Sequence, residues 1–115
     1  MSKKKPYSDA VKFLHYRAYE EQLNKDGTDY DQVIASNGGA TVAYVEGEEG
    51  VTFAFAFCHD LDRYNKELGR IKSAGRLLSD KYASSEKLTR DEFIRKVDNH
   101  MAQLYLFRKV KETIH

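Results

Sequence analysis

The fold is decided by residues 53–82, which read FAFAFCHDLDRYNKELGRIKSAGRLLSDKY. A strand rich in aromatic residues runs directly into a predicted helix with two Gly-Arg pairs, Gly69-Arg70 and Gly75-Arg76. A glycine inside a helix costs about 1 kcal/mol relative to alanine. Two in one helix therefore indicate that a neighbouring element or a ligand comes close to the backbone, and the adjacent arginines favour an anionic ligand.

The strand belongs to a predicted β-hairpin. The hairpin joins TVAYVE (residues 41–46) to VTFAFAFC (51–58) through a short loop with glycine at both ends. Since side chains alternate along a strand, the three phenylalanines share one face and the small residues share the other. We expect the bulky face in the core, while the small face would let a helix or a partner's sheet come close.

Two helices are predicted after the hairpin, over residues 61–83 and 90–113. Asp60 is the expected N-cap of the first helix, and Ser84-Ser85 would end it. The second helix opens with the capping box Thr89-Arg-Asp-Glu92. The apolar residues of the first helix recur every three or four positions and form an a/d seam, in which a glycine indicates tight packing. The seam comprises Leu61, Tyr64, Leu68, Ile71, Gly75, Leu78 and Tyr82.

The segment before the hairpin allows two interpretations. Residues 1–6 are predicted to be a flexible basic tail, and residues 26–39 a loop. Ser8 and Asp9 favour a helix over residues 9–25, although the alternation in VKFLHYRAY leaves a strand open.

Together these elements predict one α+β domain over residues 7–115, with an N-terminal helix, a central antiparallel sheet built on the hairpin, and two C-terminal helices. A two-stranded hairpin is marginal alone. We therefore expect it to complete its sheet with another chain, or with an unrecognised strand in residues 11–35. A homodimer or larger oligomer is the preferred arrangement.

Composition narrows the class of protein. The 115 residues carry a net charge of +1, which is too mild for a general DNA-coating protein. Residues 1–58 hold 6 basic and 9 acidic residues, whereas residues 59–115 hold 13 and 9. This split suits a basic pocket, or an acidic face of one subunit against a basic face of another. No apolar span or signal peptide is recognised and there is one cysteine, so a cytoplasmic protein with no membrane partner is expected.

No familiar catalytic motif is present, so no enzyme activity, catalytic residue or cofactor is expected. His59, Asp60 and Asp62 are potential metal ligands, but helix capping explains the two aspartates better, and no metal site is predicted. Cys58 is expected to be a buried structural thiol, because its neighbour His59 would point to the opposite strand face.

The basic side chains of the first helix are the main candidate site. Arg63, Lys66 and Arg70 lie within about two turns on one flank, and Arg76 follows the second glycine. Arginine offers a planar fork suited to phosphate. The alternative is an ordinary solvated helix face. The same two interpretations apply to the last helix, whose Asn99 is able to contact a base or ribose.

The run AFCHDLDRYNKELGRIKSAGRLL resembles a pattern of small phage-encoded accessory proteins. A hairpin followed by two helices also resembles, in outline, the Thoeris anti-defence proteins that sequester cyclic ADP-ribose signals between subunits. The resemblance implies that Arg70 contacts phosphate, and that Phe93, Asn99 and Arg108 are binding residues of the last helix.

We therefore expect a non-catalytic, phage-type anti-defence protein that sequesters an anionic, cyclic nucleotide at a subunit interface in the cytoplasm of the infected cell. One alternative is an inhibitor that contacts a host defence protein directly. Another is a nucleic-acid-binding accessory protein, whose affinity would fall steeply with salt.

Overall fold

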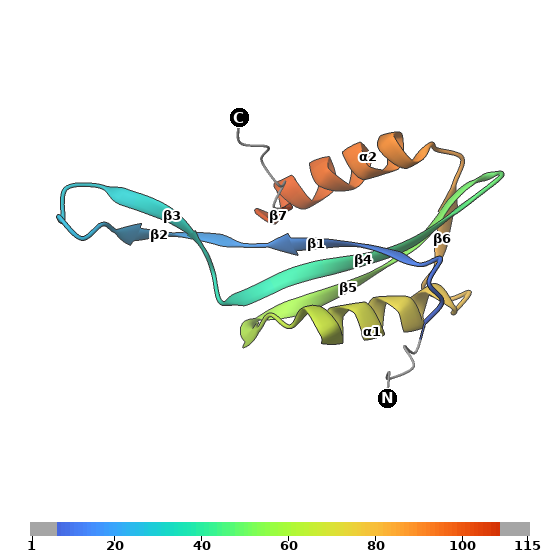
Figure 1. Ribbon diagram of the computed structural model, residues 1–115, viewed down its shortest axis with the longest axis horizontal. Coiled ribbons are helices and arrows are strands. Elements are labelled where there is room, and N and C mark those ends of the chain that lie inside the picture. The colour runs from blue at the N-terminus through green and yellow to red at the C-terminus, as the bar shows by residue number, and fades with distance from the viewer. Residues whose placement is uncertain (1–6, 109–115) are drawn as a thin grey trace.

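The computed structural model describes residues 7–108, which form a five-stranded antiparallel sheet in the strand order β6-β5-β4-β1-β7 (Figure 1). Helices α1 and α2 cover opposite faces of the sheet, and a separate hairpin, β2–β3, projects from one end. The chain is therefore an α+β protein, while the predicted tail at residues 1–6 lies outside the described residues. The elements are β1 (Lys12–Arg17), β2 (Tyr19–Leu23), β3 (Tyr30–Ile34), β4 (Asn37–Gly47), β5 (Gly50–Arg63), α1 (Lys66–Leu77), β6 (Ser84–Glu86), α2 (Arg90–Gln103) and β7 (Phe107–Arg108).

The N-terminal segment forms strands, so the predicted helix over residues 9–25 is wrong. β1 pairs with β4 and, at its last two residues, with β7. Leu14 and Tyr16 are buried on one face of the sheet, whereas His15 lies on the other. β1 pairs with β4, which lies more than 20 residues later in the sequence, and this pairing outweighs the local helix signal at Ser8. The carbonyl oxygen of Ser8 instead accepts a hydrogen bond from the backbone N–H of Val11, which closes a single turn.

The predicted hairpin is confirmed as β4–β5, and both strands are longer than expected. β1 supplies the strand that the sequence left open in residues 11–35, so this sheet is completed within one chain. The predicted loop over residues 26–39 is partly wrong, because it contains β3 and the start of β4.

The core lies between the sheet and α2, on the face that carries the bulky side chains. The ring centroid of Phe93 lies 5.0 Å from that of Phe53 and 5.2 Å from that of Tyr44. This packing confirms the predicted bulky face for Phe53 and, partly buried, for Phe55, whereas Phe57 is 51% exposed and lies outside the core. The buried cluster comprises Leu14, Tyr16, Ala40, Val42, Tyr44, Val51, Phe53, Phe93, Val97 and Met101.

The opposite face is lined by small residues, and α1 packs closely against it. Ala54 and Ala56 of β5 are buried there. A methyl group added to Gly69 of α1 would overlap the hydroxyl of Thr41 on β4. The first glycine of the helix thus permits close contact with the sheet, as the sequence indicates.

α1 begins later than predicted, because β5 continues through residues 60–63. Asn65, and not Asp60, is the N-cap: its side-chain oxygen accepts a hydrogen bond of 3.0 Å from the backbone N–H of Leu68. The predicted tight packing at Gly75 is also wrong, because nothing lies within 4 Å of a methyl group built there.

The predicted a/d seam is not buried within the chain. Leu61 and Leu78 are 81% and 83% exposed, and the buried residues of α1 are Ser73 and Ala74. Because the sheet face beneath α1 carries small residues, the helix lies close to the sheet, and only small side chains fit between them. The larger apolar side chains of α1 are therefore left facing outward.

The predicted capping box of the last helix is confirmed. Thr89 accepts a hydrogen bond from the backbone N–H of Glu92, whose carboxylate accepts one from the backbone N–H of Thr89. α2 ends at Gln103, ten residues before the predicted end, and Tyr105 turns the chain with a φ of 59°. Residues 109–113 of the predicted helix lie outside the described residues.

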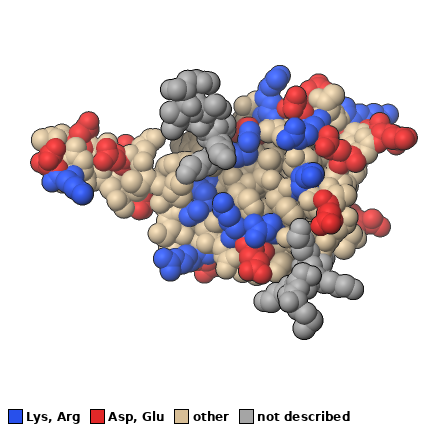
Figure 2. All heavy atoms as spheres, viewed as in Figure 1, with Lys and Arg blue, Asp and Glu red and all other residues tan. Residues whose placement is uncertain are grey.

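We refer to β2 and β3 as the arm. The arm extends away from the sheet, and acidic side chains dominate its surface (Figures 1 and 2). Residues 19–34 contain five acidic residues and one lysine. The arm makes the molecule elongated, with principal extents of 52 × 34 × 32 Å.

Candidate functional site

Three side chains form a hydrogen-bonded cluster where β1, β4 and the start of α1 meet. The Tyr64 hydroxyl lies 2.7 Å from Nδ1 of His15 and 2.9 Å from the Thr41 hydroxyl. It also donates to the carbonyl oxygen of Ala40 at 3.2 Å. The Tyr64 ring is able to reach this position because Gly39, at a φ of 132°, has no side chain in its path.

Positive charge surrounds this cluster. Burial, followed by the charges of Lys66, Arg70 and Arg17, lowers the pKa of His15 from 6.5 to about 4. His15 is therefore neutral at pH 7. The three cations come from β1 and α1, and they converge on an imidazole that adds no charge of its own.

A hollow of about 270 Å³ opens beside these cations, and we call it the basic hollow. One wall is apolar and is formed by Phe13 and Ile34. The charged groups come from three different elements, since β1, α1 and β7 each contribute one cation. The lining residues are Phe13, Leu14, His15, Arg17, Ile34, Lys66 and Arg108.

Two contacts hold the Arg17 side chain in place beside the hollow. Its Nη2 donates to the carbonyl oxygen of Ala35 at 2.8 Å, and its Cζ lies 4.5 Å from the centroid of the Tyr64 ring. Its Nε is buried and has no hydrogen-bond partner among residues 7–108. A buried donor without an acceptor costs free energy, so an anion that reaches this nitrogen would be bound favourably.

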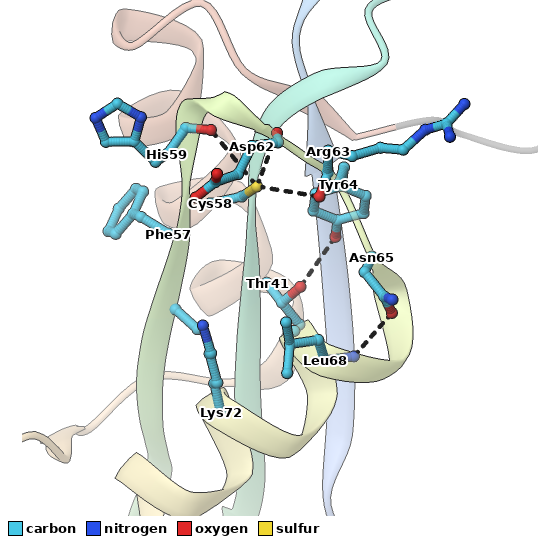
Figure 3. Close-up of a pocket in the computed structure, with 12 residues that line it drawn as sticks. Thr41, Phe57, Cys58, His59, Asp62, Arg63, Tyr64, Asn65, Leu68 and Lys72 are labelled. Atoms are coloured by element: carbon cyan, nitrogen blue, oxygen red, sulfur yellow. Dashed lines mark hydrogen bonds between the residues drawn. The ribbon is translucent and has the colours of Figure 1, made fainter.

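A second hollow lies between the end of β5 and α1, and we call it the β5–α1 pocket (Figure 3). Its volume is about 250 Å³, and Lys72 and Arg63 are its basic residues. Figure 3 shows that the Arg63 side chain points away from the pocket. The pocket is lined by Thr41, Ala56, Phe57, Cys58, His59, Asp62, Arg63, Tyr64, Asn65, Leu68, Gly69 and Lys72.

Cys58 is half-buried in this pocket and not fully buried as expected. Its Sγ lies 3.4–3.7 Å from three backbone carbonyl oxygens, those of His59, Asp62 and Arg63. Within residues 7–108 no group of three or more His, Cys, Asp or Glu side chains is arranged to hold a metal ion. His59 instead accepts a hydrogen bond from the backbone N–H of Leu61 through Nδ1.

The predicted site residues do not share one pocket. Arg63 lines the β5–α1 pocket and Lys66 the basic hollow, while Arg70 lies near His15 and borders a shallow depression beside Tyr7. Arg76 donates to the carbonyl oxygen of Phe55 at 2.9 Å.

The three residues predicted from the last helix separate as well. Phe93 is 1% exposed in the core, which leaves it no surface for a ligand. Asn99 lies on the exposed side of α2, on the face of the sheet opposite α1. Arg108 belongs to β7 and lines the basic hollow together with Lys66.

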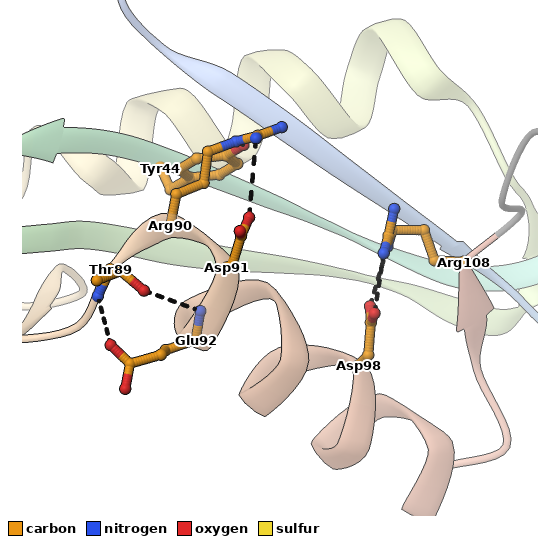
Figure 4. Close-up of polar contacts among 7 residues, drawn as sticks. All are labelled: Tyr44, Thr89, Arg90, Asp91, Glu92, Asp98 and Arg108. Atoms are coloured by element: carbon orange, nitrogen blue, oxygen red, sulfur yellow. Dashed lines mark hydrogen bonds and ion pairs between the residues drawn. The ribbon is translucent and has the colours of Figure 1, made fainter.

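Arg108 is fixed by a two-pronged ion pair with Asp98 of α2, at 2.9 and 3.0 Å (Figure 4). The Tyr16 hydroxyl donates to the same carboxylate at 2.6 Å. Burial raises the pKa of Asp98, but the hydrogen bonds from Arg108 and Tyr16 outweigh it and lower that pKa below its usual value. The carboxylate thus holds one cation of the hollow in place.

Sequence reasoning missed Phe13, His15 and Arg17, which line the hollow from β1. The available signal was the alternation in KFLHYR, which puts these three residues on one strand face. A helix over the same residues would turn His15 away from Phe13 and Arg17, so the helix interpretation concealed the site.

Comparison of the chain with family models, curated proteins and solved structures gave no match. No helix within residues 7–108 is long and apolar enough to cross a membrane.

Proposed function

We propose that this protein is a non-catalytic binding protein that holds an anionic nucleotide in the basic hollow. The observation that carries the proposal is a hollow in which Arg17 and Lys66 lie beside a neutral histidine, with the charge of Arg70 close by. None of these cations takes part in an ion pair among residues 7–108. Uncompensated like charges repel one another, so a bound anion would lower the free energy of this region.

The chemistry of the hollow suits a phosphorylated ligand with a flat ring. Arginine donates through a planar fork that matches phosphate oxygens, and the buried Nε of Arg17 lacks an acceptor. Phe13 adds an aromatic surface in the same hollow, on which a base is able to stack. A simple inorganic anion would use the arginine donors but not the aromatic surface.

The biological role would be sequestration. In the phage-type role that the sequence resemblance implies, the protein would withdraw a cyclic nucleotide signal from a host receptor. Affinity and abundance would then set its effect, because the ligand is held and not converted. A subunit boundary beside the hollow would further enclose the ligand.

The test is thermal unfolding against a ligand panel that contains AMP, NAD, cyclic dinucleotides and cyclic ADP-ribose isomers. A ligand that binds only the folded protein adds about 2.7 kcal/mol of stability at a hundredfold excess over its Kd. One compound should raise the midpoint selectively, and it should be recovered unchanged after the protein is denatured.

Matched variants locate the site. Lys66→Gln and Arg70→Gln should each weaken binding, whereas Arg95→Gln should not. The control removes the same charge from an exposed position on α2, across the sheet from α1. A flat panel, or equal losses in all three variants, would refute a specific nucleotide site.

A further inference from the structure

The arm exposes apolar side chains that nothing in the described chain covers. Leu23 and Tyr30 are 57% and 62% exposed, and they are direct cross-strand partners near the tip. The arm consists of only two strands, an arrangement that is marginal in water without another surface to pack on. Its exposed tip therefore needs a partner surface.

The β5–α1 pocket offers a surface of matching character. Leu68 lines it and is 47% exposed, and Leu61, one residue before the lining residue Asp62 on β5, is 81% exposed. The pocket is enclosed on one side by the small-residue face of the sheet. Its volume of about 250 Å³ is enough to receive a large side chain.

The charges of the two surfaces are complementary. Acidic residues dominate the arm, with Asp29 and Asp31 on either side of Tyr30. Helix α1 carries four basic residues and one acidic residue, and its Lys72 lines the pocket. Within the pocket Asp62 offsets Lys72 and Arg63 points away, so the positive charge that complements the acidic arm is that of helix α1 beside the pocket. An acidic apolar arm and a pocket bordered by this basic helix on the same chain favour a second copy as the partner.

The arm and the pocket meet at one junction. The backbone N–H of Tyr64, a pocket residue, donates to the carbonyl oxygen of Ser36 at the base of the arm. Asn37 pairs with Arg63 at the same place. Figure 1 shows that the arm extends away from the body, so its tip is directed away from the chain's own pocket.

We propose that two copies form a symmetric dimer by exchanging their arms. Tyr30 and Leu23 of each copy enter the β5–α1 pocket of the other, and Asp29 and Asp31 lie beside the partner's Lys72. A two-fold axis midway between the arm tip and the pocket makes both contacts at once, and the assembly closes at two subunits. This inference uses neither Arg17 nor Lys66, so it stands independently of the nucleotide proposal.

The first test is the oligomeric state of the full chain by sedimentation and light scattering. The wild type should have twice the monomer mass. Tyr30→Asp on the arm and Leu68→Asp at the pocket should each give monomers with unchanged circular dichroism. An equimolar mixture of the two should recover a dimer, because one intact arm then meets one intact pocket. A monomeric wild type, dimeric single variants, or a mixture that stays monomeric would overturn the proposal.

The second test uses the natural cysteine as a position marker. Tyr30→Cys should form a disulfide with the partner's Cys58 under mild oxidation, because a disulfide requires Cα atoms within about 7 Å. The product should run as a covalent dimer on a non-reducing gel. The matched control, Tyr30→Cys with Cys58→Ser, should not form it.

Three results of this experiment would contradict arm exchange. A covalent dimer that persists without Cys58 would place the two arm tips against each other. A disulfide within one chain would mean that the arm folds back onto its own pocket. If Tyr30→Cys forms no disulfide at all, the arm tip does not lie close to the pocket of either copy.

Discussion

Gly69 of α1 faces Thr41 of β4 with no room for a methyl group between them. Gly69→Ala should therefore destabilise the protein by about 2 kcal/mol, because overpacking outweighs the gain in helix propensity. Urea unfolding measures this difference. Gly75→Ala is the matched control on the same helix: the added methyl meets nothing, and the variant should be about 0.5–1 kcal/mol more stable than the wild type. Equal effects of the two changes would refute the contact.

The stability of the protein should depend on His15 in mildly acidic solution. The pKa of His15 is lowered by burial and by three nearby cations to about 4, against 6.5 in an unfolded chain. The unfolded state therefore binds a proton first as the pH falls. The stability present above pH 6.5 is lost progressively toward pH 4.

His15→Asn removes this titration and retains a polar side chain. Its unfolding free energy should vary less between pH 6.5 and 4 than that of the wild type, as measured by urea unfolding across that interval. The unfolding free energies of the wild type and of His15→Asn could instead change with pH in parallel. That result would contradict the lowered pKa of His15.

Asp98 joins α2 to both β1 and β7, so its loss should weaken the attachment of the last helix. Asp98→Ala leaves the hydroxyl of the buried Tyr16 without its acceptor and Arg108 without its counter-ion. We expect a loss of about 2 kcal/mol at pH 7. The pKa of Asp98 lies below its usual value, so the difference from the wild type should disappear as the pH falls through that lowered pKa.

The control for this variant is the ion pair between Lys96 and Glu86, whose lysine is largely exposed. Lys96→Gln should cost well under 1 kcal/mol, because exposed pairs are screened by water and salt. A comparable loss in both variants would mean that the position of a residue on α2 determines the effect, and not the hydrogen bonds of the half-buried Asp98 carboxylate.

The Tyr64 hydroxyl should couple the strands to α1. Tyr64→Phe keeps the ring beneath Arg17 but removes the contacts to His15 and Thr41, and it should cost about 1 kcal/mol. The double variant with Thr41→Val should cost less than the sum of the single changes, because both remove the same hydrogen bond. Additive losses in this mutant cycle would show that the two hydroxyls act independently.

The sequence predicted those elements whose signals are local. The capping box at Thr89 identifies the start of α2, and the glycine-flanked loop identifies the β4–β5 hairpin. The end of α2 carries no comparable signal, since it depends on the pairing of residues 107–108 with β1. The segment at residues 12–23 was misassigned because its strands are stabilised by partners distant in sequence or, in the arm, by the other arm strand.

The same reason limits what could be predicted of the candidate site. Lys66 and Arg70 were recognised on α1, but the residues that complete the basic hollow come from β1. The resemblance implies that Phe93 contacts the ligand, whereas its apolar spacing on the last helix predicts the core position that it occupies. The strand order determines which basic side chains lie close together. No pattern among neighbouring residues predicts that order.

The strand order also determines when the protein is able to finish folding during synthesis. Among the described strands β1 is translated first, yet the last residues of its outer edge pair with β7, the last of these strands to be translated. The contact between Tyr16 and Asp98 spans 82 positions of the chain. β4 and β5 can form their hairpin as soon as they leave the ribosome, but this edge stays open until residue 108 emerges. For a chaperone that binds unpaired strands during synthesis, the outer edge of β1 would therefore stay accessible for the longest time.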